Sequence, residues 1–344
     1  MEDEIRVPIY FMAGFLESGK STFLDFTIAQ DYFQIDGPTL LILCEEGEVE
    51  FDEKQLKKSR TSVEVLNSLE ELTPERLVAY DAFYSPERVI IEYNGMWQVS
   101  KFEEMQLPKD WGIVQHIVTV DASTFQVYMN NMKSLFVEMV RNADMVLFNR
   151  ASMDMPLASF RRSVKVVNQG AEIIFEDEEG EIEDIFAEKM PFDVDADVIE
   201  IMDEDYGIWF VDAMDHPETY EGKTVSFTAM VLKSREFAKD VFVPGRMAMT
   251  CCADDTSFIG YVCKSPEARH LKTGKWVKVT AVVDYEYVES YHKEGPVLTA
   301  LSVEPVEPLK QELVYFNKGV SYVFNSRAWE PRQTVRKNPS QHGV

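Results

Sequence analysis

Cysteine is scarce in this sequence: the chain of 344 residues has four, and three of them lie in the last third. So few cysteines exclude a disulfide-stapled scaffold and favour a reducing compartment. Long apolar runs are also missing, since stretches such as residues 40–44 and 145–148 are far shorter than the roughly 18 to 20 residues that cross a bilayer. Residues 1–6 show no basic region followed by an apolar one. We therefore expect a cytoplasmic protein with neither a secretory signal nor a membrane partner.

Basic residues are outnumbered, with 34 Lys and Arg against 60 Asp and Glu, a formal net charge of -26 and a pI near 4.6. This charge repels phosphate backbones, so nucleic acid is not expected as a partner. The acids concentrate in residues 172–205, which hold sixteen acids and one base, Lys189. We interpret this stretch as a solvated linker; a reservoir of divalent cations or a docking patch for a basic partner are the alternatives.

The first half of the chain alternates short apolar runs with segments of helical spacing. The runs are typical of buried strands and cover residues 8–12, 40–44, 89–91, 117–120, 145–148 and 172–175. Between two of them, residues 125–140 repeat apolar side chains at intervals of three and four, which places these side chains on one side of a helix. The alternation predicts an α/β fold with a mostly parallel sheet covered on both faces.

The pattern changes to period two in the second half, and turn signals such as Glu221-Gly222 and Pro244-Gly245 separate the runs. The alternating runs are residues 224–232, 246–250, 257–262, 276–283 and 297–303. Five short half-exposed strands predict a small all-β, OB-like barrel. The length also favours two domains. We expect these boundaries: a first domain at 1–178, an acidic linker at 179–205, the barrel at 206–310 and a C-terminal tail at 311–344.

Residues 14–21 read G-F-L-E-S-G-K-S and satisfy the phosphate-loop pattern G-x-x-x-x-G-K-[ST] between a predicted strand and a predicted helix. Glycines let backbone N–H groups curl around phosphates, and the helix N-terminus adds partial positive charge. Lys20 is expected to bridge the β- and γ-phosphates, and Ser21 to ligate Mg²⁺. The first domain is thus predicted to be a P-loop NTPase that binds its nucleotide through Gly14, Glu17, Ser18, Gly19, Lys20, Ser21 and Thr22.

A second carboxylate is needed to hold or order the magnesium shell, and the carboxyl end of a neighbouring strand is the natural place for it. Glu92 ends the strand at 89–91 and begins an E-x-x-G pattern that closes at Gly95. We predict that Glu92 holds Mg²⁺ together with Ser21, and that the N–H of Gly95 donates to the γ-phosphate. The alternative is a strand-end acid that faces solvent.

Five blocks share their order and spacing over residues 8 to about 175: the phosphate loop at 14–22, C-E-E-G-E-V-E-F-D at 44–52, E-Y-N-G at 92–95, V-D-A at 120–122 and N-R-A-S at 149–152. Together they resemble the CobW/HypB/UreG class of P-loop GTPases, which deliver metals to cofactors and enzymes, and most closely its CobW branch. The resemblance implies GTP and Mg²⁺ as cofactors, a metal-receiving client protein and the option of a homodimer.

The same resemblance implies roles for single residues. Glu45 and Asp52 of the switch segment become candidates for positioning Mg²⁺ or water, the alternative being exposed surface acids. Asn149 and Arg150 occupy the base-recognition block, where the Arg150 guanidinium could stack on the base. No arginine that completes the site from another segment can be named from the sequence, so slow intrinsic hydrolysis is expected.

Two departures from that family matter. Ser152 stands where the family has an aspartate, and a neutral hydroxyl cannot form the charged bidentate pair with a base. Asp154 could substitute if the loop shifts, so the preference for GTP over ATP is open. The family's C-x-C-C metal motif is also absent, because residues 51–88 contain no cysteine. Cys44, beside Glu45 and Glu48, is at best an improvised metal site.

The remaining cysteines form a cluster in the second half. Cys251 and Cys252 follow one alternating run, and Cys263 ends the next. Thiolates are soft ligands that suit a transition metal such as Zn²⁺, and Asp254, Asp255 or His270 could complete the shell. Adjacent strand residues point to opposite faces, however, so buried cysteines of purely structural role are an alternative, as is redox chemistry.

The surrounding sequence R-M-A-M-T-C-C-A-D-D at 246–255 is similar to the C-terminal domain of YcgQ-like membrane proteins, over about residues 210–308. No activity can be carried over from that likeness.

The function that these features predict is a nucleotide-dependent metallochaperone or metal-homeostasis GTPase. The alternatives are a nucleotide-binding regulatory or scaffold protein that does not hydrolyse, favoured by the altered block at 149–152, and an ATP-dependent P-loop enzyme such as a small-molecule kinase.

Overall fold

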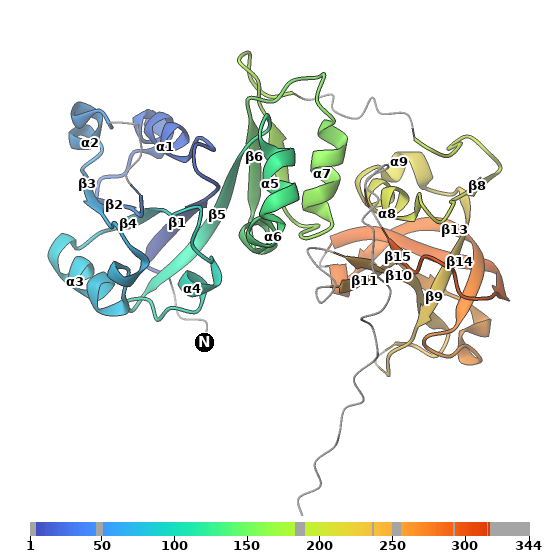
Figure 1. Cartoon of the computed structure of the whole chain (residues 1–344). Coiled ribbons are helices and arrows are strands. Elements are labelled where there is room, and N and C mark those ends of the chain that lie inside the picture. Colours follow the sequence, from blue (N-terminus) through green and yellow to red (C-terminus); the bar gives the residue numbers. More distant parts are fainter. Residues whose placement is uncertain are drawn as a thin grey trace, which may run out of the picture.

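The computed structural model describes residues 5–45, 51–182, 190–235, 237–249, 256–291, 293–314 and 316. They form a parallel-sheet domain followed by a barrel domain (Figure 1). Within these residues no helix combines the length and the apolar character needed to cross a bilayer.

The first domain is built on a seven-stranded sheet in the order β3-β2-β4-β1-β5-β6-β7, with every pair parallel. The parallel α/β fold predicted from the sequence is confirmed. Its strands are β1 (Val7–Ala13), β2 (Thr39–Leu43), β3 (Thr61–Val65), β4 (Arg88–Glu92), β5 (Trp111–Asp121), β6 (Met145–Asn149) and β7 (Glu172–Phe175).

The central strands are buried on both faces, which explains their continuous apolar runs: all five residues of β4 are buried, and so are four of the five in β2. The edge strand β3 has no fully buried residue and alternates polar with apolar side chains, so no apolar run marked it in the sequence. The connecting helices are α1 (Lys20–Ala29), α2 (Glu53–Lys58), α3 (Pro74–Tyr84), α4 (Ser100–Glu103), α5 (Phe125–Asn131), α6 (Lys133–Arg141) and α7 (Leu157–Lys165).

The helical spacing over residues 125–140 corresponds to two helices, α5 and α6, that meet at Met132. Met132 has φ -135° and ψ 32°, which no α-helix accommodates. The apolar spacing continues across Met132 because each of the two helices buries one side. Phe125 of α5 and Phe136 of α6 pack edge to face.

In the second domain five strands close into a barrel. β9 pairs with β10, β10 with β12, β12 with β14, β14 with β13, and β13 returns to β9. This confirms a small all-β barrel; the narrower OB-like assignment stays a prediction. The strands are β8 (Val198–Glu200), β9 (Thr224–Leu232), β10 (Val241–Met249), β11 (Thr256–Gly260), β12 (Val262–Lys264), β13 (Trp276–Val288), β14 (Lys293–Pro305) and β15 (Leu313–Val314).

Two details of the barrel differ from the sequence prediction. The run at 257–262 supplies β11, which pairs with β10 outside the ring, and the three residues of β12 close the ring instead. A further helix, α8 (Tyr206–Asp215), precedes the barrel, with the short α9 (Pro217–Tyr220) after it. Seven of the ten residues of α8 are buried and residues 206–211 carry no charge, so the segment lacks the one-sided stripe that marks a surface helix.

Parts of the expected linker and tail join the second sheet. β8, within 179–205, pairs in parallel with β9, and β15, within 311–344, pairs in parallel with β10. The boundaries themselves stay a prediction.

The two domains touch where α7 lies beside α8 (Figure 1). Arg161 of α7 forms an ion pair with Asp215 of α8, and both side chains are largely buried. Arg162 donates from Nε to the carbonyl of Phe316 at 3.1 Å. The helix that follows the base-recognition block is therefore in direct contact with the barrel domain.

Candidate functional site

The turn between β1 and α1 leaves no space for side chains at its glycines. Gly14 has φ +147° and Gly19 has φ +92°, both in the region that favours glycine. A Cβ at Gly14 would lie 2.4 Å from the carbonyl oxygen of Thr119, and one at Gly19 would lie 2.6 Å from Nδ2 of Asn149. The loop is therefore pressed against the carboxyl ends of β5 and β6, at the edge of a parallel sheet where ligands bind in this class of fold.

Two other residues expected to bind the nucleotide occupy different positions in this loop. The Ser18 side chain is buried and shares a 2.8 Å hydrogen bond with the Thr119 hydroxyl. Glu17 is exposed and has φ +60°, so its side chain stands away from the loop interior. Whatever these two residues contribute to a ligand would come from their backbone groups.

Lys20 is 3% exposed and its ammonium group is held by the protein itself. Nζ donates to the carbonyls of Gly14 and Phe15, both at 3.0 Å, and forms an ion pair with Oε1 of Glu45 at 2.7 Å. An ammonium has three donors, and these three partners use all of them. A phosphate could reach Lys20 only by displacing a partner, and Glu45 is the charged, side-chain member of the set.

The structure brings Ser21 and Glu92 together: the Ser21 hydroxyl donates to Oε1 of Glu92 at 2.7 Å. Glu92 is 2% exposed, and its Oε2 is buried with no hydrogen-bond partner in the described part of the chain. Burial raises the pKa of Glu92, the Ser21 hydrogen bond and the Lys20 charge lower it in part, and the Glu45 charge raises it further. An orphaned carboxylate oxygen beside a hydroxyl is an all-oxygen donor set, which fits Mg²⁺.

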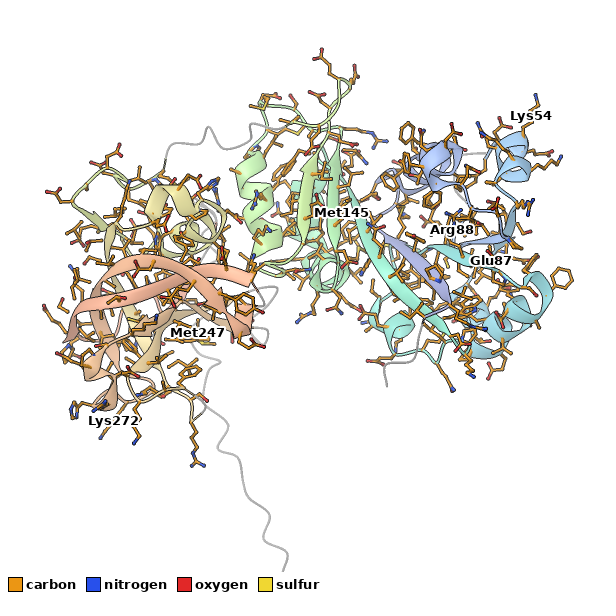
Figure 2. All side chains as sticks on the ribbon, turned by 180° about the vertical axis from the view of Figure 1, so that it is seen from behind. Lys54, Glu87, Arg88, Met145, Met247 and Lys272 are labelled. Atoms are coloured by element: carbon orange, nitrogen blue, oxygen red, sulfur yellow. The ribbon has the colours of Figure 1, made fainter. Side chains whose placement is uncertain are left out.

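The other end of the same strand carries a buried charge, Arg88, whose hydrogen bonds are satisfied within the protein. Arg88, at the amino end of β4, donates from three nitrogens to the Phe33 carbonyl and the Thr39 hydroxyl. Its guanidinium also lies 3.9 Å from the centroid of the Phe33 ring. Figure 2 shows Arg88 inside the first domain, whereas Lys54 projects outward from α2. The buried polar atom of β4 that lacks a hydrogen-bond partner is therefore Glu92 Oε2, at the carboxyl end of the strand.

Gly95 places the E-x-x-G loop directly on the phosphate loop. A Cβ at Gly95 would lie 2.3 Å from the carbonyl oxygen of Gly14 and 2.8 Å from Cα of Phe15. Asn94, next to it, donates to the carbonyl of Cys44 at 3.4 Å. The phosphate loop, the E-x-x-G loop and the start of the switch segment therefore form one contiguous patch.

Of the switch segment, residues 46–50, including Glu48, lie outside the described residues. Cys44 is 1% exposed, and its pKa is raised, first by burial and then by the Glu92 and Glu45 charges, so it is a protonated thiol. Asp52 is exposed and accepts a 2.8 Å hydrogen bond from the backbone N–H of Lys54, which caps α2. The structure therefore brings Glu45 to the phosphate loop and shows Asp52 as a helix cap; an additional role for Asp52 stays a prediction.

Asn149 and Arg150 both bond to the phosphate loop. Asn149 donates from Nδ2 to the carbonyl of Ser18 at 2.6 Å, and its Oδ1 is buried without a hydrogen-bond partner among the described residues. Arg150 donates to the carbonyl of Glu17 at 3.0 Å and pairs with Asp121. Burial alone would raise the pKa of Asp121, but hydrogen bonds from Ser123 and Arg150 outweigh it and lower the pKa.

A cavity of about 910 Å³ opens between α1, the end of β6 and the turn after β7. It is lined by Gly19, Thr22, Phe23, Phe26, Leu147, Asn149, Arg150, Ala151, Glu176, Asp177, Glu178, Glu179 and Gly180. Ser152 and Asp154 are not among these residues, and the Ser152 hydroxyl instead donates to the Asp154 carboxylate. The sequence interpretation overlooked the turn acids at 176–179 by treating them as linker, although they follow a predicted strand at the ligand-binding edge.

The cysteine cluster is only partly described. Cys251, Cys252, Asp254 and Asp255 lie outside the described residues. Cys263 is fully buried in β12, and burial raises the pKa of its thiol to about 12. His270 is exposed after the short helical turn at 266–269. Within the described ranges no three His, Cys, Asp or Glu side chains gather closely enough to hold a metal ion.

A phosphate loop, a strand-end carboxylate and an adjoining cavity of about 910 Å³ at the carboxyl edge of a parallel sheet define a P-loop nucleotide-binding protein. Residues 8–175 match the family model described as CobW/HypB/UreG, nucleotide-binding domain, and residues 179–316 match the model described as DUF1980 C-terminal domain. The first domain is thus a nucleotide-binding domain of the CobW/HypB/UreG family, and the second is a DUF1980 C-terminal domain. The sequence matches no curated protein.

Three solved structures are similar to about half of this chain. The Zn(II)-bound YjiA GTPase from E. coli has 20% sequence identity and a TM-score of 0.39, covering 52% of this chain and 59% of its own. The hydrogenase maturation factor HypB from Archaeoglobus fulgidus has 18% identity and a TM-score of 0.37, covering 50% and 82%. HypB from Helicobacter pylori in complex with nickel has 16% identity and a TM-score of 0.32, covering 50% and 80%. The chain therefore spans about 59% of the length of YjiA.

Proposed function

We propose that the first domain binds a nucleoside triphosphate, preferably GTP, together with Mg²⁺, and hydrolyses its γ-phosphate slowly in a metallochaperone or metal-homeostasis cycle. The observation that carries the nucleotide part is the convergence of Lys20, Ser21, Glu45 and Glu92 on one loop, with a buried carboxylate oxygen left without a partner. A buried polar atom that lacks a partner is costly, so its persistence at this position supports a ligand there.

Each side chain has a task in this proposal. The loop N–H groups and Lys20 would hold the phosphates, with Lys20 exchanging its Glu45 partner for a phosphate oxygen. Ser21 and Glu92 would hold Mg²⁺, which supplies charge neutralisation on the β- and γ-phosphates when bound. The backbone N–H of Gly95, a residue packed against Gly14 and Phe15, would donate to the γ-phosphate. Asp52 and Glu45 are the carboxylates that would order the attacking water.

The exchange at Lys20 supports a switch. Glu45 is the second residue of the predicted switch segment 44–52, so its release on phosphate binding would break the contact between Glu45 and Lys20 of the loop. A second connection runs from Asn149 and Arg150 through α7 to the barrel domain, where Arg161 meets Asp215. Nucleotide state could reach the barrel by this route.

The metal part of the proposal rests on the family resemblance. On that ground we also propose a metal-receiving client, a homodimer, a cytoplasmic location and a zinc site at Cys251, Cys252 and Cys263. The zinc and nickel named for YjiA and HypB concern those proteins.

The altered block at 149–152 favours a second candidate. With Ser152 and Asp154 outside the cavity, a protein that binds nucleotide without useful hydrolysis, or an ATP-dependent P-loop enzyme, would keep the phosphate loop and lose guanine preference.

A titration of a fluorescent GTP analogue with Mg²⁺, competed by GTP and by ATP, tests the proposal. Lys20→Ala should abolish binding, and Lys54→Ala, which removes an exposed lysine of α2, should not. Single-turnover phosphate release on the wild type and on Glu92→Gln then separates hydrolysis from binding. Binding that survives Lys20→Ala, or is absent from the wild type, would refute the phosphate-loop assignment.

A further inference from the structure

The cavity at the base end of the site offers apolar faces and hydrogen-bond acceptors. Phe23 and Phe26 of α1 and Leu147 of β6 supply the apolar part, and Phe26 is 63% exposed at this cavity. An exposed phenylalanine beside a hollow is the kind of surface on which a planar ring stacks.

Acceptors outnumber donors in the lining of this cavity. Asn149 uses Nδ2 on the Ser18 carbonyl, and Arg150 uses Nη1 on the Glu17 carbonyl and the Asp121 carboxylate. Asn149 Oδ1 is buried and has no hydrogen-bond partner among the described residues. The polar groups that face a ligand are therefore mainly acceptors: this amide oxygen and the carboxylates of the turn at 176–179.

Within that turn, Glu176 has the best-defined position. Its N–H donates to the Phe148 carbonyl and its own carbonyl accepts from the N–H of Ala151, both at 2.8 Å. These bonds attach Glu176 to the two sides of the block 149–152, and it is half-buried whereas residues 177–180 are exposed. Asp177 is less available, because its Oδ1 accepts from the N–H groups of Glu179 and Gly180 and closes the turn.

A carboxylate that faces the edge of a purine distinguishes the two common bases. Guanine presents two adjacent donors, N1–H and the 2-amino group, which match the two oxygens of a carboxylate. Adenine presents one donor and the acceptor N1, so a carboxylate there would oppose an unpaired lone pair. An acceptor-rich lining therefore selects guanine.

We propose that Glu176 is the residue that reads the guanine edge, accepting from N1–H and the 2-amino group at a position that neither Ser152 nor Asp154 reaches. This inference rests on the proposed nucleotide site and adds the identity of its base-specificity residue. It also assigns GTP rather than ATP as the preferred nucleotide.

The test compares four nucleotides on the full chain: GTP, ITP, XTP and ATP, each competed against a fluorescent GTP analogue in Mg²⁺. The wild type should prefer GTP over ATP by at least tenfold, and ITP, which lacks the 2-amino group, should be weaker than GTP. Glu176→Gln should weaken GTP at least tenfold and strengthen XTP, because a glutamine amide can donate to the 2-oxo group of xanthine.

Matched variants separate Glu176 from its neighbours. Glu181→Gln, an exposed acid just after the turn and outside the cavity lining, and Asp154→Asn should each keep the wild-type order of nucleotides within about twofold, and equal melting temperatures would show that all variants fold alike. An unchanged GTP-to-ATP ratio in Glu176→Gln, or a loss of preference in Glu181→Gln or Asp154→Asn instead, would overturn the assignment. Equal binding of GTP and ATP by the wild type would overturn it while leaving the phosphate site intact; no binding of any triphosphate would overturn both.

Discussion

The phosphate end and the base end of the proposed site are built in different ways. At the phosphate end, one continuous loop at 14–22 provides most of the groups, and Glu92, Gly95 and Glu45 pack onto it. At the base end, three segments far apart in sequence line a cavity: α1, the block after β6 and the turn after β7. The phosphate end can therefore be read from a short motif, while base recognition depends on which distant segments the sheet brings together.

The two ends also differ in how much space they leave. Added Cβ atoms at Gly14, Gly19 or Gly95 would all approach other atoms within 3.0 Å. The cavity at the base end has about 910 Å³ and several exposed lining residues. Substitutions should accordingly have large effects at the phosphate end and smaller, more selective effects at the base end.

Gly95→Ala should have the largest effect. Its Cβ would collide with the Gly14 carbonyl at 2.3 Å and with Phe15 Cα at 2.8 Å, and backbone atoms cannot step aside without deforming the loop. We expect nucleotide affinity to fall by about a hundredfold and the free energy of unfolding to fall by about 1–3 kcal/mol, as for overpacked sites. Competition titrations and thermal melts measure the two effects.

Gly170→Ala is the matched control for this variant, because its Cβ would meet only Asn168 Oδ1, at an ordinary 3.5 Å. If Gly95→Ala bound nucleotide as tightly as Gly170→Ala does, the E-x-x-G loop would not support the phosphate loop as described.

Glu92 should give the phosphate end a pH dependence. Burial, its largest cause, raises the pKa of Glu92, so on acidification this carboxyl takes up a proton at a higher pH than an ordinary glutamate. A protonated carboxyl is a poor Mg²⁺ ligand, so the Mg²⁺-dependent part of nucleotide affinity should decline as pH falls, by about tenfold for each pH unit below the raised pKa. Mg²⁺ titrations across acidic and neutral pH, on the wild type and on Glu92→Gln, measure this slope.

The pH dependence of folding stability that Glu92 causes has the opposite sign to that of nucleotide affinity. A carboxyl whose folded pKa exceeds its unfolded pKa binds its proton more tightly in the folded state, so Glu92 favours folding as pH falls through the raised pKa. Without ligand, Glu92→Gln should therefore be at least as stable as the wild type at neutral pH. A clear loss of stability would mean that the charged Glu92 stabilises the empty protein.

Glu45→Gln tests the ion pair that holds Lys20. If phosphate must displace the Glu45 carboxylate, a neutral side chain at position 45 should raise GTP affinity by about three- to tenfold, within the range of a charge-assisted hydrogen bond. Glu53→Gln, an exposed acid of α2, is the control and should change nothing. Weaker binding of GTP in Glu45→Gln would show that Glu45 assists the nucleotide instead of competing with it.

The sequence predicted most of the fold where residues are buried on both sides. Six of the seven strands of the first sheet appear as apolar runs, because parallel strands covered on both faces are continuously apolar. β3 was missed because it is a half-exposed edge strand, and β12 because three residues are too short for any periodicity. α8 was missed because most of its residues are buried and its first six carry no charge, which leaves no regular polar stripe to show its period.

The site divides in the same way. The placement of Ser21 and Glu92 at one magnesium site could be proposed from two local motifs that each follow a strand, and the structure brings these two side chains together. The contact of Lys20 with Glu45 and the contribution of Glu176 to the cavity could not, because each depends on how loops from different strands meet. The acidic composition of residues 172–205 also concealed Glu176 among residues that read as a solvated linker.

Arg150→Met should have the smallest effect. It measures how much Arg150, at the base end of the site, contributes to GTP affinity. Arg150 is 55% exposed, and its ion pair with Asp121 joins the block 149–152 directly to the end of β5 at the surface. Exposed ion pairs contribute about 0–1 kcal/mol, and a methionine keeps the apolar stem, so GTP affinity should fall by less than about fivefold. Asp121→Asn removes the charge of the same pair but keeps the hydrogen bond from Arg150 to the Glu17 carbonyl, so its loss should be equal or smaller in the same titration. A much larger loss in Arg150→Met than in Asp121→Asn would mean that the guanidinium contacts the nucleotide directly, and base recognition would then be shared between Arg150 and the turn after β7.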